Sequence, residues 1–419
     1  MAFERTVLDN GITVVSEHMP WVRSITLGFW FRVGSRHETA DQAGLTHFME
    51  HMMFKGTDSR SAIEISEAFD ALGAESNAFT AKEYTCYHAR FVDHRLDDAL
   101  ELLADMVLHS TFRDEDILTE REVVLEEIAS SEDEPDDHVF EMFLDELLPT
   151  HPLGRPVLGT VERVASYGRD DCISFHRSFY HAGNLVVSAA GNVDHASLVW
   201  KVQEALAGIR AGKPLERIPL IESNRHEFAA QKRDIEQAYL VYGFPWYRAD
   251  ARERFAGSVL TSILGGSASS RLFQEVREKR GLAYSIMAGA SVYSDTGQFY
   301  VYCATRPDNL AQAAEIIRHE MARIADEPPS AEEVSRNCEV ITSQLLLGLE
   351  STSERMIRLG RRETMGFAQV EVPELIERYA SVTPDEVQDV ARKYLTVFPT
   401  ATVVSPFAEG MARQLVLGR

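Results

Sequence analysis

Two patterns of apolar and polar residues succeed each other along the first half of the chain. Strands are predicted over Thr13–Val15, Ser24–Val33 and Tyr84–Val92, and the second of these alternates in the way typical of a strand. Apolar residues recur at helical spacing over Ala43–Lys55, Ala62–Ala71, Leu96–His109 and Glu115–Ser130. Strands followed by long helices predict an α+β fold, in which a sheet carries helices packed on one face.

The second half of the chain repeats features of the first. Glu162–Ser166 reads Glu-Arg-Val-Ala-Ser, and about half a chain later Glu377–Ser381 reads Glu-Arg-Tyr-Ala-Ser. Apolar strand-type runs follow at Leu185–Ala190 and Thr400–Val404. A repeat at half the chain length is typical of two similar domains, because solenoid repeats are much shorter. The match is short, so chance similarity stays open as an alternative.

A chain of 419 residues also exceeds the size at which single hydrophobic cores stop growing, so more than one domain is expected. Gly212, Pro214 and Pro219 interrupt the pattern between the two halves. We therefore predict one domain over residues 1–215, a linker over 216–228, and a second, homologous domain over 229–419.

The composition restricts the classes of partner. The hydrophobic share of 45% and the charged share of 26% are those of an ordinary globular protein. A net charge of −23 argues against nucleic acid or an anionic membrane surface as partner. It leaves two alternatives open, a merely soluble acidic surface and an acidic cavity that attracts cationic substrates.

Neither the start of the sequence nor the cysteines show a special motif. No apolar run is long enough to span a membrane, and the first fifteen residues resemble neither a secretory signal nor a transit peptide. We therefore expect a cytoplasmic protein with no membrane partner. The four cysteines are scattered without a Cys-x-x-Cys pair, which indicates reduced, mostly buried thiols.

The main chemical motif lies in the first predicted helices. His47–His51 reads His-Phe-Met-Glu-His, an H-x-x-E-H pattern. Residues four apart share one helix face, so both imidazoles can reach one metal ion while Glu50 reaches a water beside it. The alternative is two half-exposed histidines beside a salt-bridging glutamate. The apolar neighbours favour the metal, because burying these polar groups without a partner would be costly; they are Phe48, Met49, Met52, Met53 and Phe54.

A catalytic zinc ion takes three protein ligands and keeps one position open, so a third ligand is required. The predicted helix containing Arg121–Ile128 offers candidates. The apolar residues of this helix are expected to define its buried side; they are Val123, Val124 and Ile128. Glu127 lies beside them, whereas Glu126 points further round. Glu120 lies two turns before Glu127 on the same face and can orient a ligand.

These motifs resemble the pitrilysin-type zinc peptidases, peptidase family M16, over nearly the whole chain. Within that family the resemblance is closest to the short bacterial members similar to the processing-peptidase β subunit. It implies one zinc ion per chain, held by His47, His51 and Glu127. It also implies that Glu50 is the catalytic base and that Glu120 is a catalytic-site carboxylate behind the ligands.

The resemblance extends to two further motifs. Gly73–Thr80 resembles the strand whose edge binds the substrate backbone, which implicates Asn77, Ala78, Phe79 and Thr80. Arg277 and Tyr284 match residues that reach the bound peptide from the second domain. The alternative for this pair is a structural salt bridge and a packed aromatic ring.

The family also implies an architecture and an activity. Each domain would be a mostly antiparallel sheet with helices on one face and would form half of a clamshell. The implied activity is that of a zinc-dependent endopeptidase acting on short or unfolded polypeptides enclosed in a chamber. A homodimer is expected, with a heterodimer also open. A non-catalytic peptide-binding or scaffold protein, and a catalytic subunit that needs a distinct partner, stay open as alternatives.

Overall fold

The computed structural model describes residues 3–215 and 227–418, which form two compact units. Among these residues the first unit holds the chain up to Ala129, Arg155–Leu215 and Leu346–Glu371. The second unit holds Ser130–Gly154, Glu227–Leu345 and Val372–Gly418. The units therefore differ from the continuous ranges 1–215 and 229–419. Ser130–Gly154 belongs to the second unit, and Leu346–Glu371 belongs to the first. The expected linker, 216–228, lies almost wholly outside the described residues.

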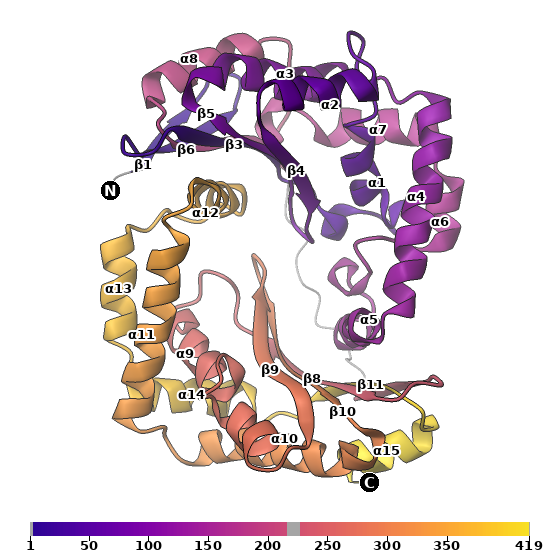
Figure 1. The fold of residues 1–419 in the computed structure, drawn as a ribbon, viewed down its shortest axis with the longest axis vertical. Coiled ribbons are helices and arrows are strands. Elements are labelled where there is room, and N and C mark those ends of the chain that lie inside the picture. The colour runs from indigo at the N-terminus through magenta and orange to yellow at the C-terminus, as the bar shows by residue number, and fades with distance from the viewer. Residues whose placement is uncertain (1–2, 216–226, 419) are drawn as a thin grey trace. The chain divides into compact units, whose positions relative to one another are not determined.

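The first unit is built on a six-stranded sheet. Its strands lie in the order β1 (Phe3–Val7), β2 (Thr13–His18), β6 (Leu185–Gly191), β3 (Ser24–Phe31), β5 (Thr85–Val92) and β4 (Glu75–Thr80). β2 and β6 are parallel, and the other neighbours are antiparallel. β4 forms one edge of this sheet (Figure 1).

Helices from the first half of the chain bury the main core of this unit against one face of the sheet. They are α1 (Leu45–Met52), α2 (Ala62–Ala71), α3 (Leu96–His109), α4 (Asp114–Asp133), α6 (Val161–Ser166), α7 (Arg169–Phe179) and α8 (His195–Ala205). α12 (Thr352–Thr364), which comes from the second half, packs on β2, β3 and β6 (Figure 1). Its Met356 and Leu359 form a separate small core with Trp30 and Val186.

The second unit repeats this architecture. Its five strands lie in the order β7 (Phe228–Lys232), β11 (Thr400–Ser405), β8 (Ala238–Trp246), β10 (Gly297–Thr305) and β9 (Ala283–Val292). β7 and β11 are parallel and the other neighbours antiparallel. This order reproduces β2-β6-β3-β5-β4 of the first unit, so the structure agrees with the internal repeat found in the sequence.

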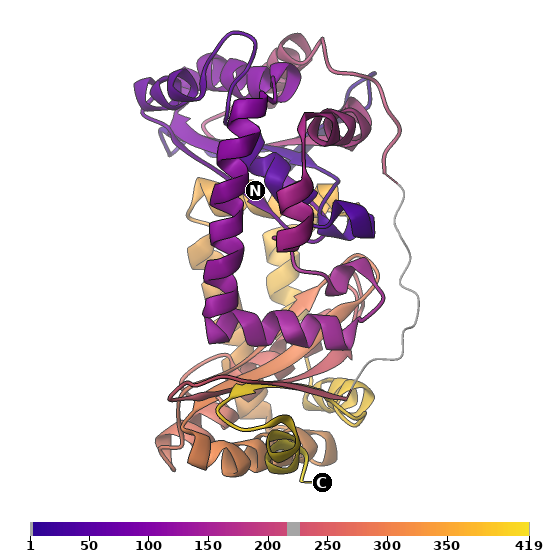
Figure 2. The same cartoon turned by 90° about the vertical axis from the view of Figure 1, so that its right-hand side faces the viewer.

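Most helices of the second unit come from the second half of the chain. They are α9 (Arg254–Gly265), α10 (Leu310–Asp326), α11 (Ala331–Gly348), α13 (Val372–Ala380), α14 (Pro384–Tyr394) and α15 (Glu409–Leu417). α5 (Pro135–Leu147), from the first half, packs on β8 and β11. Figure 2 shows this sheet from the side, between α5 and the yellow helix α15. Phe143 of α5 packs there against Val241 and Val404.

The predicted α+β class, with mostly antiparallel sheets, is confirmed. The prediction of helices on one face of each sheet is incomplete. The other face is covered by α12 in the first unit and by α5 in the second, and we call these two the exchanged helices. The four cysteines are free and buried, as expected. Among the described residues no helix is both long and apolar enough to cross a membrane.

Candidate metal centre

The helix that carries the H-x-x-E-H motif is fixed at its start by a buried carboxylate. Gly44 precedes α1 with a φ of 89°, and a Cβ there would collide with the backbone of Leu158. The carboxylate of Glu38 accepts hydrogen bonds from the backbone N–H groups of Gly44 (2.9 Å) and Thr46 (2.7 Å). Burial raises the pKa of Glu38 to about 7, although these hydrogen bonds and Arg155 oppose the shift.

The rest of α1 is held by its apolar side chains. Phe48, Met49, Met52 and Met53 are all at most 1% exposed, as expected from the sequence. The side chains of His47 and His51 stay 13% and 18% exposed. The two imidazoles therefore face away from the core and toward a common point.

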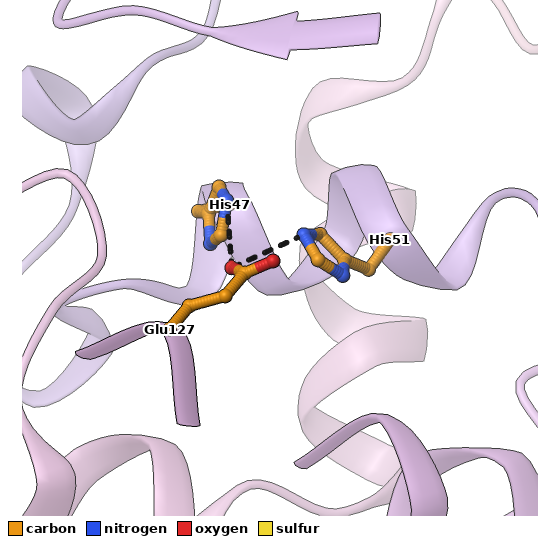
Figure 3. A group of neighbouring side chains, drawn as sticks. All are labelled: His47, His51 and Glu127. Carbon is orange, nitrogen blue, oxygen red and sulfur yellow. Dashed lines mark ion pairs between the residues drawn. The ribbon is translucent and has the colours of Figure 1, made fainter. Parts of the chain in front are cut away.

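Glu127 of α4 completes a cluster with the two histidines. Its Oε2 atom lies 3.7 Å from His47 Nε2 and 3.6 Å from His51 Nε2 (Figure 3). The imidazole ring centroids are 4.6 Å apart. One donor atom from each residue lies within 4.8 Å of the other two. Two imidazole nitrogens and a carboxylate oxygen are the donor set of many catalytic zinc sites, so these residues fit the metal.

The surroundings act on the two imidazoles in opposite directions. Burial lowers the pKa of His51, but the hydrogen bond with Glu120 and the nearby carboxylate of Glu127 outweigh it and raise that pKa above its ordinary value. Burial, with a smaller contribution from His51, lowers the pKa of His47 to about 4. Nδ1 of His47 is buried without a hydrogen-bond partner among the described residues. Nδ1 of His51 instead lies 2.9 Å from Oε1 of Glu120. A carboxylate at this position holds a proton on Nδ1 and leaves Nε2 free for a metal.

Lys55 extends this chain of contacts outward. Its Nζ atom lies 2.6 Å from Oε2 of Glu120, whose side chain is only 4% exposed. Burial raises the pKa of Glu120, but the hydrogen bonds from His51 and Lys55 outweigh it, so the pKa falls below its ordinary value. The sequence pattern indicated Glu120 but not Lys55, which lies four residues after His51 and beyond the end of α1.

Glu50 lies beside the cluster and has its own partner. The hydroxyl of Thr80, at the end of β4, donates a hydrogen bond of 2.5 Å to Oε2 of Glu50. Burial raises the pKa of Glu50, and this hydrogen bond opposes the rise. Thr80 was expected to bind substrate, and its contact with Glu50 had no signal in the sequence because it joins a strand to a distant helix.

The other residues of β4 lie on an exposed sheet edge. The backbone N–H of Ala78 donates a hydrogen bond of 2.8 Å to Oδ1 of its neighbour Asn77. The ring of Phe79 packs edge-on against Trp30, with centroids 5.5 Å apart. Phe79 therefore has a packing role in the first unit, while the backbone N–H of Ala78 contacts the side chain of Asn77.

The structure brings Arg277 and Tyr284 of the second unit together. Arg277 lies in a π-helix, Phe273–Glu278, and Tyr284 lies on the edge strand β9. The guanidinium of Arg277 donates to the backbone oxygen of Tyr284 (2.9 Å) and lies 4.7 Å from the centre of its ring. The ring of Tyr284 remains 82% exposed. The expected contact of this pair with a peptide stays a prediction.

One expectation about α4 is wrong. Val123 was placed on the buried side of the helix, but it is 42% exposed, whereas Val124 (0%) and Ile128 (4%) are buried. The buried stripe of α4 is narrower than the sequence indicated and includes the carboxylate Glu120, whereas the side chain of Glu127 is 41% exposed. Glu126 is exposed, as expected.

Comparison with known proteins decides the family. Residues 13–161 match the model of the insulinase family, peptidase family M16, and residues 166–340 match that of the peptidase M16 inactive domain. An uncharacterized zinc protease of Streptomyces coelicolor is 43% identical over 418 residues, covering 98% of this chain and 91% of the relative. The chain belongs to peptidase family M16.

Other M16 relatives are similar over their full length. An uncharacterized zinc protease of Bacillus subtilis is 37% identical, covering 96% of this chain and 98% of its own. One from Mycobacterium tuberculosis is 40% identical, covering 97% and 94%. The predicted pitrilysin-type family is thus confirmed. The expected closeness to the processing-peptidase β subunit remains a prediction.

Solved structures support the M16 fold. A peptidase M16 inactive domain from Pseudomonas fluorescens matches with a TM-score of 0.92 at 19% identity, covering 97% of this chain and 99% of that one. A protease from Helicobacter pylori matches with a TM-score of 0.88 at 21% identity, with coverage of 97% and 99%. At these identities the likeness concerns the fold alone.

Proposed function

We propose that this M16 protein is a zinc-dependent endopeptidase that cleaves short or unfolded polypeptides and holds one zinc ion per chain. The observation that carries the proposal is the convergence of His47, His51 and Glu127, with the carboxylate of Glu50 beside them. Several relatives named zinc proteases support the same activity.

The residues of the site divide the work of amide hydrolysis. A zinc ion on His47, His51 and Glu127 would lower the pKa of a water molecule and polarise the scissile carbonyl. Glu50 accepts the proton of the attacking water, while the hydroxyl of Thr80 holds the carboxylate in position through Oε2. The same carboxyl then gives that proton to the leaving amine. Glu120 and Lys55 hold the His51 ring in place.

The edge strand β4 supplies a place for the peptide backbone. An extended peptide that pairs with β4 gains backbone hydrogen bonds whatever its sequence, which suits unfolded substrates. The N–H of Ala78 lies on this edge strand and is held by the side chain of Asn77 in the free protein. A peptide carbonyl would take the place of that side chain.

Metal content and cleavage measured on the same preparations test the proposal. Wild type should bind about one zinc ion per chain and cleave members of a mixed peptide library, as read by mass spectrometry. Glu50→Gln should keep the metal and lose turnover, and His51→Ala should lose most of the metal. Full zinc occupancy in His51→Ala would contradict the ligand assignment.

Two further outcomes separate the alternatives. A protein that binds zinc and peptides without cleaving them would be a scaffold. Cleavage that appears only after another cellular fraction is added would indicate a distinct partner subunit. Sedimentation of the active preparation tests the proposed homodimer, which requires one species of twice the chain mass.

A further inference from the structure

A polar hollow of about 330 Å³ lies within the first unit, outside the candidate metal centre. One wall is the segment that follows α3, including Thr111 and Phe112, and the other is α7. Three arginines line it: Arg169 and Arg177 on α7, and Arg210 from the segment after α8. Asp58 contributes the only acidic side chain to its lining.

The arginines of this hollow lack carboxylate partners. Among the described residues no ion pair within 4 Å involves Arg169, Arg177 or Arg210, and Asp58 also lacks one. Arg210 donates to the backbone oxygens of His176 (2.9 Å) and Arg177 (3.0 Å), so a structural role as a helix cap explains its position. Arg169 donates a longer hydrogen bond to the backbone oxygen of Thr111 (3.3 Å), and no hydrogen bond to the described residues accounts for the guanidinium of Arg177.

The formal charge of the lining is therefore positive in a chain of net charge −23. Burial, with a further contribution from Arg177, lowers the pKa of Arg210, which indicates that the two cations lie close together. Burial lowers the pKa of His176 to about 4, so this side chain is neutral near pH 7. Three arginines and one aspartate leave two positive charges unbalanced.

The wall of the hollow also contains strained backbone. Phe112 has a φ of 48°, the one positive value at a non-glycine residue in the described chain. It is held there because its side chain is 4% exposed and its ring lies 5.5 Å from that of His176. The adjacent hydroxyl of Thr111 donates to the backbone oxygen of Gly56 (3.3 Å). Strain of this kind persists where the surroundings fix it, often at binding sites.

We propose that this hollow binds the phosphate group of a compact phosphate-bearing anion. A phosphate carries about −1.5 to −2 charges at neutral pH, which matches the two unbalanced charges. A phosphate group also offers three terminal oxygens to guanidinium groups that approach from different elements, whereas a carboxylate offers two oxygens and one charge. The hollow has room for a phosphate or pyrophosphate group.

Titration calorimetry with inorganic phosphate and with pyrophosphate tests this site at low and at moderate salt. The test variant is Arg169→Gln with Arg177→Gln, which leaves Arg210 in place as the cap of α7. The matched control is Arg306→Gln, an exposed arginine of the second unit outside the hollow. Wild type and control should bind alike, and the double variant should bind roughly tenfold or more weakly. Binding should weaken as salt rises.

The comparison also separates this site from the metal centre. Both variants keep every residue of that centre, so phosphate that binds there would be retained in both. Equal phosphate binding by the double variant and wild type overturns the proposal, as does no binding by wild type at millimolar phosphate. Equal affinity for acetate overturns the choice of phosphate. If the double variant fails to unfold cooperatively, Arg177→Gln alone carries the test, because its guanidinium makes no hydrogen bond to the described residues.

Discussion

His47 and His51 lie one helical turn apart, yet their surroundings differ. His51 has a carboxylate on Nδ1, and that carboxylate is itself held by Lys55. Nδ1 of His47 is buried and lacks a partner among the described residues. The orientation of one imidazole therefore depends on a charged network, while that of the other depends on packing alone. Removing the charged network around His51 should therefore lower the affinity of the site for zinc.

Glu120→Gln should weaken zinc binding by roughly 10–100-fold, because the neutral amide is a poorer partner for His51 and leaves Lys55 without a counter-charge. Competition with a chromophoric chelator measures the affinity. Glu126→Gln is the matched control, since it removes an exposed carboxylate from the same helix and should change nothing. Equal affinities in the two variants would show that Glu120 does not support the site.

At this scale the sequence predicted the cluster and one of its supports, Glu120, but not the roles of Thr80 and Lys55. His47, Glu50 and His51 follow from a single spacing, and Glu127 follows from its place beside apolar residues. Thr80 and Lys55 had no such signal. Thr80 reaches Glu50 from a strand of the sheet, and Lys55 lies beyond the end of α1, where helical spacing no longer predicts direction. Val123 was misplaced because the stripe of α4 is partly polar.

The stability of the protein should depend on pH through Glu38, whose carboxylate accepts hydrogen bonds from the start of α1. Its pKa of about 7 in the folded protein lies above the ordinary value of 4.5. A raised carboxyl pKa contributes stability that is complete below about pH 4.5 and is lost as pH rises through about 7. The free energy of unfolding of wild type, minus that of Glu38→Gln, should therefore fall between pH 5 and pH 8. Urea titrations at several pH values measure this difference, and a constant or growing difference would contradict the assigned pKa.

The exchanged helix α12 offers a test of packing, because steric collision and helix propensity predict opposite signs for the change in stability. Glycine inside a helix normally costs about 1 kcal/mol relative to alanine, so Gly→Ala usually stabilises. A Cβ at Gly360 would instead collide with the indole of Trp30, which donates to Ser188 (2.8 Å). Gly360→Ala should therefore destabilise the protein by about 1–3 kcal/mol. Gly410→Ala in α15, which meets nothing within 4 Å, should be neutral or slightly stabilising. Thermal unfolding of both variants measures the contrast.

Helices could be predicted where the pattern of apolar residues along the chain is sufficient to define them. The predicted ranges of α2 and α3 match the structure, because each has a strong apolar stripe. The exchange of α5 and α12 was not predictable, since nothing in the sequence of a helix says which of two similar sheets it covers. The same limit applies to β1 and β7, short strands whose register is set by their neighbours.

At the scale of the whole chain, the two units share one strand order but differ in chemistry. The first carries the metal cluster, and Gln344 stands where the repeat would place a counterpart of Glu127. In the second unit the residues with a predicted role are Arg277, which is half-buried, and the exposed Tyr284. Their contact with each other has a structural explanation, since the guanidinium caps a carbonyl and stacks on the ring. That explanation accounts for the ring of Tyr284, but it leaves the hydroxyl unused.

Tyr284→Phe separates these two roles, because phenylalanine keeps the ring for Arg277 and removes only the hydroxyl. If the hydroxyl donates to the developing oxyanion of a bound peptide, kcat should fall on the order of 10²-fold. Zinc content and melting temperature should stay at wild-type values, since the ring is 82% exposed. Arg277→Ala should raise KM and lower kcat, because the guanidinium of Arg277 also holds the ring of Tyr284 in place. Unchanged kcat in Tyr284→Phe, together with a lower melting temperature in Arg277→Ala, would mean that the pair serves only the fold of the second unit.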